Sequence, residues 1–96
     1  MDKDLVLYVG VSPKPYYGCN YWYVDLTGKT LPKTFVWVKM GRHDTEQIVY
    51  VDSVRWCKLC DAPYPFDKAK RIIKQTTVEE SKLAKRDWEI NQQIFL

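Results

Sequence analysis

Alternating apolar and polar positions predict three short strands in the N-terminal part of the chain. Residues 5–11 place every second side chain on one apolar face, and Pro13 ends this run because proline donates no hydrogen bond to a strand ladder. Residues 21–25 and 34–40 are rich in the aromatic and β-branched residues that favour extended backbone. A turn around Gly28 separates these two runs, so consecutive strands are expected to pair antiparallel.

The longest strand is predicted over residues 46–56, after a polar turn at 41–44. Both faces of this strand are partly apolar, which suits a strand that curls through a small barrel. A β-bulge is expected near Asp52 and Ser53. The predicted strand region therefore extends over residues 5–56.

Two helices are predicted after the strands. Over residues 66–75, apolar side chains recur at helical spacing with basic side chains on the opposite side, which predicts a short amphipathic helix. Thr77 is followed three residues later by Glu80, a capping box that predicts a second helix over residues 78–94. The apolar stripe of this second helix is ragged, so we expect it to need a partner, either the barrel or another chain.

The order of these elements predicts a mainly β chain with C-terminal helices (β+α). Strands joined by short connections close best as a small antiparallel barrel, SH3-like or open, followed here by one or two helices. A chain of 96 residues leaves no room for a second domain, so residues 1–96 are expected to form a single domain.

Composition adds a high aromatic content and a localised positive charge. Phe, Trp and Tyr make up 15% of the chain, and a core this small cannot enclose them all, so some are expected at the surface. The net charge is +3, which is modest for a nucleic-acid-binding protein. The positive charge is concentrated in residues 66–76, where one acidic residue stands against Lys68, Lys70, Arg71 and Lys74.

Neither a membrane span nor secretion is expected. No apolar run approaches the ~20 residues that cross a bilayer, and the first residues lack the pattern of a signal peptide. The three cysteines, an odd number, are most simply explained as free thiols in a reducing compartment. We therefore expect a cytoplasmic protein with no membrane partner.

A zinc site is a minor alternative for the cysteines. Cys57 and Cys60 form a C-x-x-C pair, which Cys19 and His43 would complete to a Cys3His set. The spacings differ from those of paired zinc knuckles, and two thiols that fall close together in a loop explain the pair more simply. The acidic residues show no spacing typical of a metal site or a glycosidase pair. We expect no metal, no cofactor and no catalytic residues.

Aromatic side chains interleaved with basic ones are the remaining candidate for function. Stacking platforms beside cationic side chains are how small barrels hold single-stranded nucleic acids. Part of the aromatic set must instead fill the core, so this interpretation competes with a purely structural one. The candidates for base stacking are Tyr21, Trp22 and Trp37, those for phosphate contacts are Lys39, Arg42 and Arg55, and a cationic flank is expected from Lys70, Arg71 and Lys74.

A resemblance adds to this interpretation. Residues 31–42, a strand of alternating valines that ends in a Gly-Arg turn, are followed by a Val-rich strand at 46–51. This pattern resembles the N-terminal DNA-binding domain of the primosomal helicase PriA, and residues 21–24 are similar to an aromatic strand of that domain. The Met-Gly-Arg-His turn at 40–43 and the Ala-Pro-Tyr segment that opens residues 62–74 also resemble short uncharacterised proteins of Firmicutes and their mobile elements. The resemblance covers about residues 5–75.

The resemblance implies a compact antiparallel barrel of the PriA N-terminal type that binds DNA, including the 3′ end of a single strand. The PriA domain has an acidic residue at the place of Trp22, so stacking is expected here in place of that polar contact. The leading hypothesis is a small non-enzymatic nucleic-acid-binding accessory protein. The alternative is a protein-interaction module of a mobile element without nucleic-acid contact, which would bind a partner or itself through the C-terminal helix.

Overall fold

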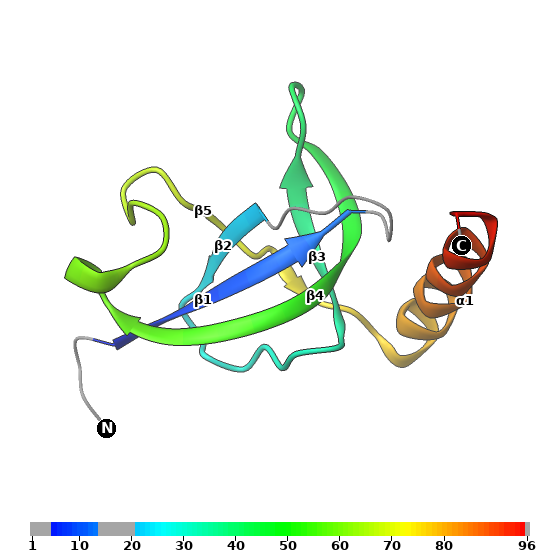
Figure 1. Ribbon diagram of the computed structural model, residues 1–96, viewed down its shortest axis with the longest axis horizontal. Coiled ribbons are helices and arrows are strands. Elements are labelled where there is room, and N and C mark those ends of the chain that lie inside the picture. Colours follow the sequence, from blue (N-terminus) through cyan, green and yellow to red (C-terminus); the bar gives the residue numbers. More distant parts are fainter. Residues whose placement is uncertain (1–4, 14–20, 96) are drawn as a thin grey trace.

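A strongly curled sheet forms most of the structure, a computed structural model that describes residues 5–13 and 21–95 (Figure 1). The sheet order is β5-β2-β1-β4-β3-β6, and all neighbouring strands pair antiparallel except β2 and β5. The expectation that consecutive strands pair is wrong for β2 and β3, because β1 and β4 pair with each other and lie between them. The predicted class, mainly β with a small curled barrel and a C-terminal helix, is confirmed. The elements are β1 (Leu5–Ser12), β2 (Tyr21–Asp25), β3 (Phe35–Met40), β4 (Thr45–Lys58), the 3-10 helix η1 (Leu59–Asp61), β5 (Lys70–Arg71), β6 (Lys74–Gln75) and α1 (Val78–Phe95).

The long strand β4 pairs with β1 and β3 at once, and a bulge allows it to curl between them. Gly10 pairs with Ser53, whereas the next residue, Val11, pairs with Val51, so Asp52 is the extra residue of β4. The Ser12 hydroxyl donates a hydrogen bond to the Asp52 carboxylate and holds the bulge. The bulge expected from the sequence is therefore confirmed.

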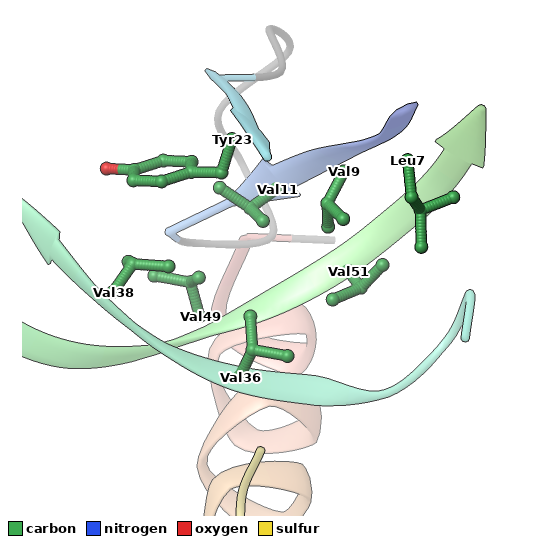
Figure 2. Packing of buried hydrophobic residues seen from close by; sticks show 8 residues of the cluster. All are labelled: Leu7, Val9, Val11, Tyr23, Val36, Val38, Val49 and Val51. Atoms are coloured by element: carbon green, nitrogen blue, oxygen red, sulfur yellow. The ribbon is translucent and has the colours of Figure 1, made fainter. Parts of the chain in front are cut away.

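The inner face of the curled sheet carries the main core. Valines dominate it, and their β-branched side chains fit the pleated surface of the strands. Figure 2 shows side chains from four strands converging on one volume. The eight buried members are Leu7, Val9, Val11, Tyr23, Val36, Val38, Val49 and Val51.

A second, smaller cluster lies on the outer face, which explains why β1 and β4 are apolar on both sides. Tyr8, Val24 and Cys57 are buried there beneath the segment 59–69. The Tyr8 hydroxyl donates to the backbone carbonyl of Tyr64 at 2.9 Å and ties this segment to the sheet. The same cluster supports Trp22 at one side, which positions this side chain for the site described below.

The helix predicted over residues 66–75 is wrong, because this stretch continues the sheet. Ala69 donates to the carbonyls of Pro65 and Phe66 in a single turn, and the chain then becomes extended. The β-branched residues Ile72 and Ile73 favour the extended form. Their amides donate to β2 and β3, at 3.0 Å to Val24 O and 2.9 Å to Trp37 O respectively.

The segment 70–75 therefore bridges the two edges of the sheet. Its first residues form β5 on β2, and its last residues form β6 on β3. Ile72 lies between these two strands and packs against the main core. We call residues 70–75 the bridging segment.

The C-terminal helix begins at Val78, as the capping box predicts. The Thr77 amide donates to Glu80 Oε1 at 2.8 Å, and the Glu80 amide donates to Thr77 Oγ1 at 3.2 Å. The helix lies to one side of the sheet (Figure 1) and packs on the outer face of β3 and β4. Trp88 provides the main contact, stacked on Tyr50 with ring centroids 4.5 Å apart. The partner that this helix requires is thus the barrel of its own chain.

Candidate nucleic-acid interface

The aromatic residues proposed for base stacking fall into two separate places. Trp22 lies on β2 and Trp37 on β3, and β1 and β4 run between these strands in the sheet. Both side chains point to the outer face, because the residues next to them in sequence belong to the core. Trp37, however, lies beneath α1, whereas Trp22 borders a separate pocket. The two tryptophans do not form one platform.

A pocket at the rim of the barrel brings Tyr21 and Trp22 together with lysines. Its volume is about 270 Å³. Tyr21 is 47% exposed at its mouth, Trp22 is half-buried, and Lys68 and Lys70 are exposed. The remaining lining comes from β2, the end of β3, the β3–β4 turn and the 59–69 segment. We call this the rim pocket, and its lining residues are Tyr21, Trp22, Tyr23, Met40, Gly41, Tyr64, Lys68 and Lys70.

The position of Trp22 depends on the absence of a side chain at Gly10. A Cβ atom on Gly10 would lie 3.0 Å from Ser53 Oγ and 3.3 Å from the Trp22 ring. The indole therefore lies directly over the β1 backbone, held between the outer cluster and the pocket. This contact fixes one aromatic wall before any ligand binds.

Hydrogen bonds hold Tyr23 and the backbone of Tyr64, two of the three tyrosines that line the rim pocket. The Tyr23 hydroxyl donates to the Lys39 carbonyl at 2.8 Å, which joins β2 to the end of β3. Burial and, secondly, the nearby Asp44 charge raise the pKa of Tyr23 to about 12, so it remains a neutral donor. Tyr64 is positioned through its backbone by the hydroxyl of Tyr8. These contacts fix the Tyr23 side of the pocket and the segment that carries Tyr64.

One of the two pocket lysines is paired with an acidic residue. Lys70 forms an exposed ion pair with Asp44 in the β3–β4 turn. The hydrogen bond from Lys70, followed by its charge, lowers the pKa of Asp44 below its ordinary value. Exposed ion pairs are weak because water competes for both partners. A phosphate is therefore able to replace the Asp44 carboxylate as the partner of Lys70.

The other predicted basic residues are distributed around this pocket or away from it. Arg55 pairs with Tyr8 across β4 and β1, and Arg71 pairs with Val24 across β5 and β2, so both lie on the same outer face as Trp22. Arg42 is exposed in the turn that follows Gly41, a pocket residue. Lys39 lies on the outer face of β3, opposite Glu46.

Trp37 and Lys74 are engaged with α1 or with each other. The Trp37 indole N–H donates to Glu80 Oε2 at 3.2 Å, and Lys74 Nζ lies 5.5 Å from the centroid of the Trp37 ring. These contacts leave Trp37 unsuited to stacking on a base from solution.

Sequence reasoning missed Tyr64 as a site residue and placed Lys68 on the polar face of a helix. The signal for Tyr64 was its position between Pro63 and Pro65, which exclude regular structure and so place the aromatic side chain in an irregular segment. Lys68 follows in the turn after Pro65, where its amide donates to the Pro65 carbonyl at 3.1 Å. Both residues reach the rim pocket through this turn.

The described residues contain no cluster of zinc ligands, and Cys19, one of the four proposed ligands, lies outside them. Cys57 is buried in the outer cluster, whereas Cys60 is exposed in η1. Burial raises the pKa of the Cys57 thiol, which is opposite to the change that favours a metal-binding or redox-active thiolate. No group of three or more potential ligands of a metal ion gathers within residues 5–13 and 21–95.

Comparison with known proteins gave no match, whether with protein-family models, with curated proteins or with solved structures. Over residues 5–13 and 21–95, no helix combines the length and the apolar character needed to cross a membrane.

Proposed function

We propose that this protein is a non-enzymatic binding protein for single-stranded DNA, and that the rim pocket is its site. The observation that carries the proposal is the convergence of Tyr21, Trp22 and Tyr64 with Lys68 and Lys70 around one pocket. Aromatic faces beside cationic side chains are the combination that binds bases and phosphates of single strands. The resemblance of residues 5–75 to the PriA N-terminal domain supports DNA as the ligand, including its 3′ end.

The size and charge of the pocket agree with this ligand. A volume of about 270 Å³ lies just below the usual ~300–1,000 Å³ of small-molecule sites and suits one base more than a large organic ligand. Arg55 and Arg71 extend the positive charge along the outer face beyond the two lysines. The lysines of the rim pocket and the arginines of the outer face thus offer cationic partners for phosphates on either side of a bound base.

Tyr21→Ala is expected to weaken binding of a labelled single-stranded oligonucleotide by between about fivefold and a hundredfold, because one stacked base contributes ~1–3 kcal/mol. Fluorescence anisotropy at low salt measures this effect. Tyr21 is 47% exposed, so its removal leaves the core intact. Trp56→Ala is the matched control, since Trp56 is 45% exposed and lies against Gly28, outside the rim pocket. No binding at low salt, or binding indifferent to salt, would contradict the proposal.

Asp44→Asn is expected to strengthen DNA binding severalfold, because it releases Lys70 for a phosphate. The logarithm of affinity should also fall more steeply with the logarithm of salt concentration, by up to ~0.7 for one added phosphate contact on a single strand. Glu79→Gln, an exposed position on α1, changes the net charge by the same amount and is the control. If both variants gained the same affinity, the change in net charge alone would explain the effect, and the rim pocket would not be its cause.

A second candidate function is protein interaction through α1. Leu83 and Ile90, 65% and 46% exposed, stand seven residues apart and so lie on the same side of the helix. Exposed apolar side chains in such a row favour association with another helix. Sedimentation of the intact chain separates the two candidates: self-association without DNA binding supports the second, and a DNA-binding monomer supports the first.

A further inference from the structure

A second pocket, between α1 and the sheet, has a lining of different chemistry. Its volume is about 300 Å³. Phe35, Trp37 and Tyr50 line it from the sheet, and Ala84 and Trp88 line it from the helix. We call this the helix pocket.

The small side chain of Ala84 explains why the helix pocket exists. Glu80, Ala84 and Trp88 follow one another at intervals of four residues and so form one row on α1, which faces the sheet. Glu80 contacts Trp37 at one end of the row, and Trp88 contacts Tyr50 at the other. The methyl group of Ala84 is too short to fill the space between these two contacts, so a hollow with aromatic walls remains.

Aromatic rings dominate the walls of this pocket. Trp88 stacks on Tyr50 and meets the Phe35 ring edge-on, with centroids 6.4 Å apart. Aromatic faces carry negative electrostatic potential and attract cations that lose little hydration energy. Lys74 Nζ already lies 5.5 Å from the centroid of Trp37, so a cation of this chain occupies a position over one of these rings.

Two carboxylates line the helix pocket, and Lys74 beside it offsets part of their charge. Asp87 and Glu80 both line the helix pocket, and the described residues of its lining include no lysine or arginine. The hydrogen bond from the Thr77 amide, and then that from the Trp37 indole, lower the pKa of Glu80, so it stays ionised near neutral pH. The rim pocket, by contrast, carries two lysines. An anion such as DNA is therefore disfavoured at the helix pocket, and a cation is favoured.

We propose that the helix pocket binds a quaternary ammonium group. Each oxygen of Glu80 accepts one hydrogen bond, from the Thr77 amide or the Trp37 indole, and the Asp87 carboxylate adds a second negative charge to the lining. A methylated ammonium needs no acceptors and is weakly hydrated, which matches these walls. The group has two possible sources, a small molecule such as choline or a trimethylated lysine in a peptide.

Titration with choline tests the proposal, with the indole N–H signals of Trp37 and Trp88 followed by NMR. Choline is expected to shift these signals saturably. Its neutral isostere 3,3-dimethylbutan-1-ol has the same shape without the charge, and is expected to bind at least tenfold more weakly. Equal affinity for the two compounds, or no saturable shift, would overturn the proposal.

Two variants connect the binding to this pocket. Asp87→Asn removes one carboxylate charge from the lining and leaves the capping box and the Trp37 hydrogen bond in place, so it is expected to weaken choline binding several-fold, whereas Glu79→Gln outside the pocket should not. Ala84→Leu fills the space and is expected to abolish choline binding while the chain remains folded. Unchanged binding in Ala84→Leu would place the ligand elsewhere and refute the site. The affinity of a trimethyllysine peptide is compared with that of its unmethylated form and with that of choline. Tighter binding of the methylated peptide indicates a modified protein as the source, and tighter binding of choline indicates a small molecule.

Discussion

Asp25→Ala is expected to lower the free energy of unfolding by about 3–5 kcal/mol, because this buried carboxylate organises the turn after β2. Asp25 is 6% exposed and accepts from the amide and hydroxyl of Thr30, at 2.9 and 2.6 Å, and from Thr27 and the Lys29 amide. Thr30 is itself buried, so alanine would leave its donors without an acceptor. Urea unfolding followed by circular dichroism measures the loss. Asp61→Ala, at an exposed position in η1, is the control and should change stability by less than about 0.5 kcal/mol.

The same carboxylate makes stability depend on pH at the acidic end. Burial alone would raise the pKa of Asp25, but the hydrogen bonds from Thr27 and Thr30 outweigh it and lower the pKa from 3.8 to about 2. A depressed pKa stabilises the folded state fully above the unfolded value, and this contribution is lost as pH falls from about 4 towards 2. It amounts to about 2 kcal/mol. The stability difference between the native chain and Asp25→Asn should therefore shrink between pH 6 and pH 2, and a constant difference would contradict this origin.

Trp88→Ala is expected to release α1 from the sheet at a cost of about 2–3 kcal/mol, less than for a fully buried tryptophan because Trp88 is half-buried. Its stacking on Tyr50 and its edge contact with Phe35 hold the middle of the helix. An undocked helix of this length is marginal in water. Hydrogen exchange should then lose protection over residues 78–95, while β1 and β4 keep theirs.

Ile90→Ala provides the matched control on the same helix, since Ile90 is 46% exposed. It should leave the protection of α1 nearly unchanged. Simultaneous loss of protection in the helix and in the strands of Trp88→Ala would show that α1 and the barrel unfold as one unit, contrary to this expectation.

Local sequence signals predicted the elements whose structure depends on local chemistry. The strand at 21–25, the bulge near Asp52 and the capping box of Thr77 and Glu80 follow from side-chain alternation or from hydrogen bonds within a few residues. The failure at 66–75 has a different physical cause. The apolar residues in this stretch are spaced as on one face of a helix, but they are buried in two different places. Phe66 packs on the outer cluster, and Ile72 packs on the core.

The candidate site was only partly predictable for a related reason. The sequence named Trp22 and Trp37 as stacking candidates but did not show whether they lie together. Strand order decides whether two strand positions meet, and strand order depends on contacts distant in sequence. Tyr64 and Lys68 reach the rim pocket because the 59–69 segment folds over the outer face. That fold depends on the burial of Tyr8 and Val24, which no motif around Tyr64 indicates.

The bridging segment has a consequence for how the protein behaves at high concentration. Unpaired strand edges recruit strands of other molecules and so promote aggregation. Here the outer edges of β2 and β3 are each occupied by residues of one short stretch, 70–75. The side chains of Lys70, Arg71 and Lys74 place like charges at these positions, which further opposes edge-to-edge pairing of two copies. Part of the positive charge that suggested a nucleic-acid partner thus also protects the sheet from polymerising through its edges.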